Sequence, residues 1–195
     1  MPSGPRSHLS LLTLVLGGVL LALFVVGTAP AGSAGRPYKS TVFHPAFRLE
    51  LPKGWVVAER GPDVAQIYRR CSRCTHEGEE NGEITFDMAL AKLSPAKAIA
   101  LLRRTPGIRA TRVRSVAYGT LRGLGFTAKR TGGGFEFPRS GYHSEPTDAP
   151  LKVSAVPVAG STVTVFIDPH ELAPAKAPAF TKDAIGILKT VRFTK

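Results

Sequence analysis

The chain has 195 residues, of which 26 are Lys or Arg and 14 are Asp or Glu, so its formal net charge is +12. A hydrophobic fraction of 43% excludes a disordered or fibrous protein, and a total of two cysteines excludes a densely disulfide-linked scaffold. The basic excess favours an anionic partner, but the chain contains no nucleic-acid recognition motif, so we expect no nucleic acid as partner.

Residues 1–34 have the composition of an export signal. Arg6 is their only charged residue, an apolar run covers residues 9–26, and small residues three apart place a cleavage site after Ala31 or Ala34. An uncleaved membrane anchor at 9–26 is the alternative, because a run of this length is close to what spans a bilayer. There is no Cys near the segment for lipidation, and no Arg pair precedes the run, which favours the general secretory route. We therefore expect a periplasmic, cell-wall associated or secreted protein.

The remainder of the chain is expected to form one domain. Residues 35–46 are interpreted as a linker or an extended entry, and the domain is expected over residues 47–195. Alternating apolar residues predict a first strand at 47–51. Further strands are predicted at 55–57, 64–70 and 83–90, the last with Ile84, Phe86, Met88 and Leu90 on one face and Glu83, Thr85 and Asp87 on the other.

A helix is predicted after these strands. Apolar residues recur with helical spacing from Pro95 to Leu102, and Ser94 is suited to cap the helix N-terminus. The sequence Thr-Pro-Gly at 105–107 ends the helix. Next, a hairpin is predicted from strands 112–118 and 121–130, with a turn at 119–120 that places Val113 opposite Phe126 and Ser115 opposite Leu124.

This hairpin lies in the most basic part of the chain. Residues 88–135 contain ten basic residues and no acidic residue. The predicted register places Arg112, Arg114 and Lys129 together on the second face of the hairpin. We expect this basic face to bind an anionic component of the cell envelope, such as lipid head groups, a wall polymer or an acidic protein. A solvated face that only maintains solubility is the alternative.

The last third alternates loops with regular elements. Residues 131–150 are rich in Gly, Pro and Ser and are predicted to form a long surface loop. A second hairpin is predicted from 151–158 and 162–168, followed by an amphipathic helix at 178–189 and a short strand at 191–193. Strand pairs combined with two helices predict an α+β fold, in which helices flank a central antiparallel sheet.

The entry to the domain, Phe47-Arg48-Leu49-Glu50-Leu51-Pro52-Lys53-Gly54-Trp55, resembles the apolar strand and Pro-x-Gly-Trp sequence of PsbP-like domains, which are named for an extrinsic subunit of photosystem II. The order of elements from residue 43 to residue 194 is also similar. The resemblance implies a sandwich of sheet and helices that serves mainly as a non-enzymatic accessory or binding module, including in exported bacterial proteins. Many bacterial relatives are lipoproteins, and this chain lacks the lipidated Cys. The resemblance carries over neither photosynthetic function nor metal ligands.

The two cysteines form the sharpest local motif. In an oxidising compartment, Cys71 and Cys74 are expected to form a disulfide. A redox-active dithiol is a second hypothesis, although the residues that follow do not begin a helix of the kind that stabilises a thiolate. A metal site is a third, with Cys71, Cys74 and His76 as zinc ligands and Glu77 or a distant His completing a tetrahedron.

Two weaker candidate sites involve carboxylates and histidines. The acidic stretch is a candidate for calcium and is otherwise a solvated turn; it consists of Glu77, Glu79, Glu80, Glu83 and Asp87. The loop residues His143 and His170 each lie near acidic residues with which they could form an acid and base pair; these are Glu145, Asp168 and Glu171.

Together these features predict an exported, non-catalytic binding or accessory protein of the cell envelope that needs no cofactor. Recognised serine-hydrolase, zinc-protease and phosphate-loop motifs are absent from the sequence. The alternative function is a small thiol-disulfide oxidoreductase or metal-dependent hydrolase centred on Cys71, Cys74 and His76.

Overall fold

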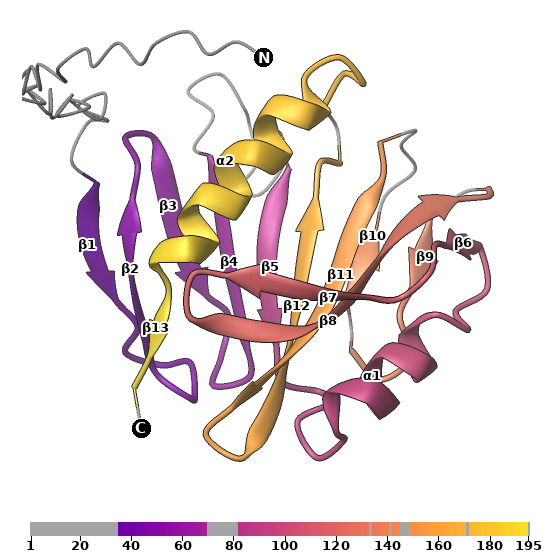
Figure 1. The fold of residues 1–195 in the computed structure, drawn as a ribbon. Helices are drawn as coiled ribbons and strands as arrows, with labels where there is room; N and C mark the ends of the chain where they lie inside the picture. The colour runs from indigo at the N-terminus through magenta and orange to yellow at the C-terminus, as the bar shows by residue number, and fades with distance from the viewer. Residues whose placement is uncertain are drawn as a thin grey trace, which may run out of the picture. The chain divides into compact units, whose positions relative to one another are not determined.

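The computed structural model describes residues 35–69, 82–132, 134–140, 142–144, 149–170 and 172–194. An eight-stranded antiparallel sheet forms the centre of the fold (Figure 1). Its main path runs in the spatial order β3 (Trp55–Glu59), β4 (Val64–Arg69), β5 (Glu83–Asp87), β12 (Ser161–Asp168), β11 (Leu151–Val158), β8 (Leu121–Arg130) and β6 (Ile108–Ala110). β7 (Arg114–Tyr118) also pairs with β8, on the same edge as β6.

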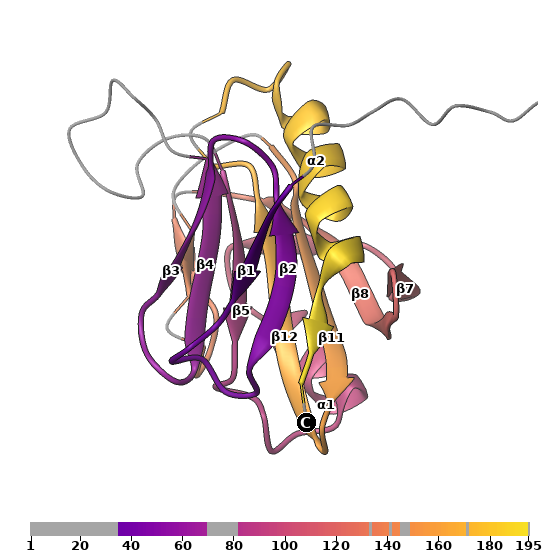
Figure 2. The ribbon, with the colours of Figure 1, turned by 90° about the vertical axis from the view of Figure 1, so that its left-hand side faces the viewer.

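Each face of the central sheet is covered by one helix and one smaller β structure. α2 (Ala177–Thr190) packs on the first face with a three-stranded sheet, whose order is β1 (Arg36–Lys39), β2 (Phe47–Leu51) and β13 (Arg192–Phe193). Figure 2 views the molecule from the side of this small sheet, with β13 continuing from the end of α2. α1 (Pro95–Leu102) packs on the second face with the hairpin of β9 (Phe135–Glu136) and β10 (His143–Ser144). The predicted α+β fold is therefore confirmed.

Of the two interpretations of residues 35–46, the extended entry agrees with the structure and the linker does not. Residues 36–39 form β1, which pairs with β2, and Phe43 is fully buried against Phe47 and Phe86. Glu59 fixes the bend that follows β1, because its carboxylate accepts the backbone N–H groups of residues 41, 42 and 43 at 2.5 to 3.2 Å. The sequence does not predict this strand, because Pro37 and Pro45 interrupt any alternation of apolar residues.

The segment predicted as one long surface loop, 131–150, contains part of the second core. Phe135, Phe137 and Tyr142 are at most 7% exposed, and their rings pack on Phe166 of β12 or on one another. Gly and Pro around these aromatic residues interrupt any period of two, so the sequence pattern predicts a loop where a short hairpin forms.

The predicted polar face of the strand at 83–90 is buried as well. β5 is central in the sheet, between β4 and β12, and Glu83, Thr85 and Asp87 are all less than 9% exposed. The expectation of a solvated acidic turn is therefore wrong for Glu83 and Asp87, because both faces of this strand are covered. Glu77, Glu79 and Glu80 lie outside the described residues.

Candidate functional site

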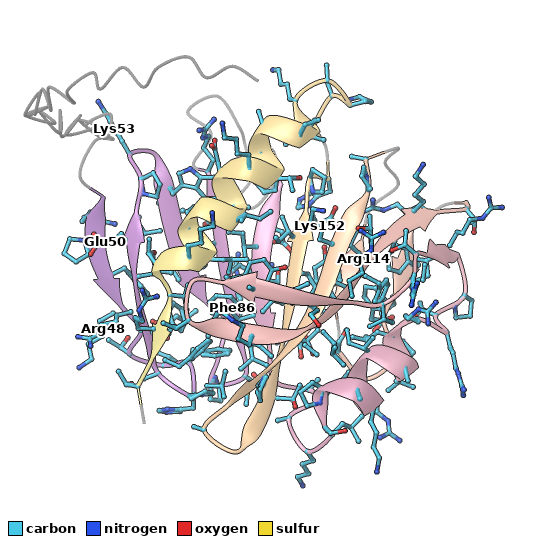
Figure 3. The ribbon with its side chains drawn as sticks, viewed as in Figure 1. Arg48, Glu50, Lys53, Phe86, Arg114 and Lys152 are labelled. Carbon is cyan, nitrogen blue, oxygen red and sulfur yellow. The ribbon has the colours of Figure 1, made fainter. Side chains whose placement is uncertain are left out.

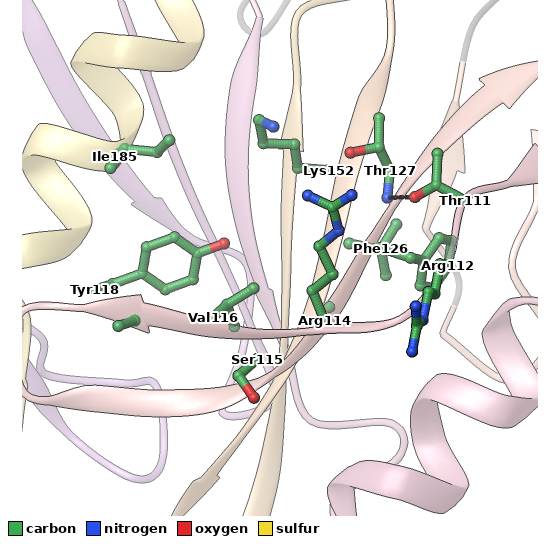
Figure 4. A pocket seen from close by; sticks show the side chains of 13 residues that line it. Thr111, Arg112, Arg114, Ser115, Val116, Tyr118, Phe126, Thr127, Lys152 and Ile185 are labelled. Atoms are coloured by element: carbon green, nitrogen blue, oxygen red, sulfur yellow. Dashed lines mark hydrogen bonds between the residues drawn. The ribbon is translucent and has the colours of Figure 1, made fainter.

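A groove separates α2 from the edge of the central sheet formed by β7, β8 and β11. One cavity of this groove has a volume of about 490 Å³, within the range of small-ligand sites. Figure 4 shows the side chains that line it. They are Thr111, Arg112, Arg114, Ser115, Val116, Ala117, Tyr118, Gly125, Phe126, Thr127, Lys152, Val153 and Ile185.

Strand register brings two cations to this groove from separate hairpins. Arg114 of β7 lies opposite Gly125 of β8, and Lys152 of β11 lies opposite Thr127 of β8. Because residues alternate along β8, both cations project on the face that α2 covers. In Figure 4 the Arg114 side chain extends over the floor of the groove toward Lys152.

Gly125 lines the groove at a position that has no room for a side chain. A Cβ atom at Gly125 would lie 2.8 Å from the carbonyl oxygen of Val153 and 2.9 Å from Cγ1 of Val116. No side chain fits at this position without displacing β11 or β7. Arg114 pairs with this glycine across the two strands, so no β8 side chain stands beside it at this position.

The edge strand contains a bulge that redirects Arg112. β6 pairs with β8 through Ala110 and Ala128, whereas β7 begins pairing at Arg114 and Gly125, so three residues of one strand oppose two of the other. Thr111 fixes the bulge, because its backbone N–H donates to the Thr127 carbonyl and its Oγ1 accepts the Thr127 N–H, both at 2.9 Å. Arg112 consequently points away from Arg114 and Lys152 in Figure 4, although it still lines the cavity.

The structure brings together part of the predicted basic face. Arg112 and Arg114 line the groove, whereas Lys129 lies farther along β8, opposite Arg109 of β6, and is not among the lining residues. The register of Ser115 with Leu124 is as predicted. Lys152 was missed, although it is the single charged residue of its strand, a signal that could have found it.

A second cavity, of about 730 Å³, continues along α2 beyond Lys152 and Ile185, which line both cavities. Its lining consists of Ala149, Pro150, Lys152, Pro174, Ala177, Pro178, Thr181, Lys182, Ile185, Gly186 and Lys189. None of the described residues that line either cavity is Asp or Glu. The charged residues among the described lining are therefore all Lys or Arg.

The cations of the groove have no acidic partners among the described residues. The described Lys and Arg ion pairs join Arg69 to Asp183 and Arg130 to Asp168. Arg112, Arg114 and Lys152 belong to neither pair. An anion in the groove would gain charge-assisted contacts without displacing an internal carboxylate.

One end of the groove is closed by the turn between β7 and β8. Gly119 has φ +59°, and a Cβ atom there would lie 2.2 Å from the Lys189 carbonyl oxygen, so the turn packs directly on the last turn of α2. Tyr118 precedes it, and its hydroxyl lies 3.3 Å from Oγ of Ser154. Burial raises the pKa of Tyr118 while the Ser154 contact lowers it, and the neutral phenol forms part of the wall.

A separate polar cluster lies on the face covered by α1. Arg130 donates to both carboxylate oxygens of Asp168 at 2.7 Å, and the Tyr142 hydroxyl donates to the same carboxylate at 2.6 Å. Nδ1 of His170 lies 3.9 Å from Oδ2 of Asp168, so the structure brings this predicted pair together. Because Arg130 and Tyr142 already occupy the carboxylate, the cluster is suited to joining strands rather than to proton transfer.

Glu83 extends this cluster across the sheet. Gln66 and Thr85 donate to its two carboxylate oxygens at 2.9 and 2.7 Å. Burial raises its pKa, although the Thr85 hydrogen bond and the nearby His170 lower it. The carboxyl group is therefore a buried part of the sheet rather than an exposed cation ligand.

The remaining predicted site residues fall outside the described part of the chain. They are Cys71, Cys74, His76, Glu77, Glu145, Glu171 and the side chain of His143. Within the described residues, no cluster of three or more His, Cys, Asp or Glu side chains could hold a metal ion. The described helices also include none that is long and apolar enough to cross a membrane.

Comparison with known proteins gives structural similarities alone. No family model matches the chain, and no curated protein matches it. Among solved structures it is similar to cyanobacterial PsbP from Synechocystis, at 7% identity and a TM-score of 0.49 over 87% of this chain and 99% of that one.

Two further solved structures show similarities of the same size. LpqN of Mycobacterium tuberculosis, which is involved in cell envelope biogenesis, has 14% identity and a TM-score of 0.41 over 85% of this chain and 88% of that one. A Bacteroides thetaiotaomicron protein has 13% identity and a TM-score of 0.46 over 83% of this chain, which spans about half, 49%, of that protein's length.

Proposed function

We propose that this chain is an exported, non-catalytic binding protein of the cell envelope that holds an anionic partner in the groove between α2 and the edge of the sheet. The observation that carries the proposal is the set of cations, Arg112, Arg114 and Lys152, around a cavity without a described acidic lining residue. Lys129 on the same face of β8 would contact a partner that extends beyond the groove.

The export signal and the basic groove support the proposal together. A protein that carries residues 1–34 as an export signal would meet phosphate and carboxylate groups on lipids and wall polymers. The groove offers hydrogen-bond donors and positive charge, and its Tyr118 and Thr127 hydroxyls are neutral. Such a lining is suited to binding rather than to bond cleavage.

The proposal is tested by charge reversal. We expect the protein to bind envelope membranes of the cells that produce it, and added salt to release it, because screening weakens contacts between exposed charges. The combined change Arg112→Glu, Arg114→Glu and Lys129→Glu should weaken binding at least about tenfold, as loss of a few charge-assisted contacts implies. Sedimentation of the protein with the membranes measures the effect.

A matched control separates the groove from the overall charge. Arg48, Arg36 and Lys39 are exposed on the small sheet, and Figure 3 shows Arg48 away from Arg114 and Lys152. Reversing these three charges changes the net charge equally and should leave most of the binding. If both triple variants lost membrane binding to the same extent, the net charge alone would explain the interaction, and binding in the groove would be contradicted.

A further inference from the structure

The two cavities along α2 differ in chemistry. Arg112, Arg114 and Lys152 are among the residues that line the first. The second begins at Lys152 and Ile185, and its interior is largely aliphatic, with side chains from Pro150, Pro174, Ala177, Pro178 and Ile185. Lys182 and Lys189 of this second cavity are exposed, and their alkyl stems add apolar surface while their ammonium groups remain in water.

α2 presents this apolar part through one helical face. Pro178, Thr181, Ile185 and Lys189 recur at intervals of three or four residues, and the cavity runs along them. Ile185 is only half-buried, although α2 buries its other large apolar residues, Phe180, Ile187 and Leu188. An apolar side chain is therefore available to a ligand at the junction of the two cavities.

Gly186 widens the same face. It lies inside the helix, and a Cβ atom added to it would have no atom within 4 Å. Glycine in a helix interior costs about 1 kcal/mol relative to alanine. No described neighbour requires glycine at this position. The sequence therefore leaves open space on this face although alanine would favour the helix.

We propose that the ligand of this groove is a single-chain anionic amphiphile, bound as one molecule. This inference rests on the proposed function and specifies its ligand. The anionic head group lies between Arg114 and Lys152, and the alkyl chain runs past Ile185 into the second cavity along α2. The direction follows from the two linings, which meet at Lys152 and Ile185: Arg114 and Lys152 lie at the first cavity, whereas Pro and Ala side chains line much of the second, where Lys182 and Lys189 are exposed.

The proposal is tested by titration calorimetry on the protein as its producing cells export it. Three probes are compared below their micelle concentrations: lauroyl lysophosphatidylglycerol, lauroyl lysophosphatidylcholine and glycerol phosphate. The first has a chain and a net negative charge, the second has the same chain with a neutral zwitterionic head, and the third is the anionic head group alone.

Four variants locate the ligand. Arg114→Glu removes a head-group contact, and Ile185→Glu places a charge in the path of the chain. Because Ile185→Glu also affects packing, Gly186→Trp provides a second block from a backbone position with open space. Ala179→Glu is the matched control, since Ala179 is exposed on α2 and lines neither cavity.

We expect lauroyl lysophosphatidylglycerol to bind at least about tenfold more tightly than either other probe, because it alone uses both halves of the groove. Arg114→Glu, Ile185→Glu and Gly186→Trp should each weaken it at least about tenfold, and Ala179→Glu should not. If lysophosphatidylglycerol and glycerol phosphate bound equally, and only Arg114→Glu weakened their binding, the inference of an amphiphilic ligand would be overturned. The proposed binding of an anion in the groove would still hold.

Other outcomes overturn more. Equal binding of the two lauroyl lipids, unaffected by Arg114→Glu, would show an uncharged apolar site and contradict both this inference and the proposed function. No binding of any probe, with salt-sensitive binding to whole membranes retained, would mean that the groove recognises a surface rather than a single lipid, which also overturns the inference.

Discussion

Asp87 is a carboxylic acid at the end of the buried strand β5. Burial, aided by the nearby charge of Asp63, raises its pKa to about 7, although the Ala89 N–H donates to its carboxylate at 2.6 Å and acts in the opposite direction. The folded protein therefore holds this proton more tightly than the unfolded chain, in which the pKa is close to 3.8. The protonated Asp87 side chain therefore adds to the free energy of unfolding. This contribution is complete below the pKa of the unfolded chain and is lost as the pH rises through the pKa of the folded protein.

The change Asp87→Asn keeps an acceptor for the Ala89 N–H and removes the ionisation. We expect the variant to match the original protein near pH 4 and to exceed its free energy of unfolding by about 2 kcal/mol at pH 8. Urea unfolding at the two pH values measures the difference. A pH dependence unchanged by Asp87→Asn would contradict the buried ionisation.

Single residues also mark where sequence patterns reach their limit. The turn at Gly119 and Thr120 gives the correct register of Ser115 with Leu124, because a two-residue turn fixes the pairing of its strands. The same register extended to Arg112 fails, since the bulge at 111–113 shifts the pairing by one residue. A bulge depends on the partner strand, so β6 had to be known before Arg112 could be placed.

At the level of elements, helices were predicted best. α1 was expected from Pro95 to Leu102 with Ser94 as its cap, and it spans these residues, with Oγ of Ser94 accepting the Lys97 N–H at 3.4 Å. α2 was expected at 178–189 and spans 177–190. Helical spacing is a local signal and survives without knowledge of the partner.

Strands that depend on distant partners were predicted less well. β1, β6, β9 and β10 are short, and proline, glycine or charge interrupts their alternation. Burial of both faces of β5 could not be predicted either, because its covering comes from elements far along the chain. The position of α2 beside Lys152, which creates the groove, is likewise a property of packing.

Alanine at two glycines, one in α2 and one in β8, should change the free energy of unfolding in opposite directions. Gly186→Ala should raise the free energy of unfolding by about 0.5–1 kcal/mol, since a Cβ there meets open space and lowers the entropy of the unfolded chain. Gly123→Ala should lower it by about 1–3 kcal/mol, because the Cβ would lie 2.2 Å from the Ala155 carbonyl oxygen. Thermal and urea unfolding compare the two variants. If Gly186→Ala lowered the free energy of unfolding, the added Cβ would have to contact a neighbour, which would contradict the open space at this position.

On the scale of the whole molecule, two cores have different roles. The face covered by α1 is closed by aromatic stacking and by the buried pair of Arg130 with Asp168. The face covered by α2 is closed toward the small sheet and open toward β7, where the cations lie. A rigid sheet with one incompletely covered edge is a common way to hold a ligand without moving the scaffold.

The most direct test of the groove is nuclear magnetic resonance of the exported protein during titration with glycerol phosphate, because the method detects even weak binding of a head group. We expect the largest backbone amide shifts at Arg114, Thr127 and Lys152, with their loss in Arg114→Glu. Shifts spread evenly over exposed cations such as Lys39, Arg48 and Lys92, or unchanged in Arg114→Glu, would contradict a binding site between α2 and the edge of the sheet.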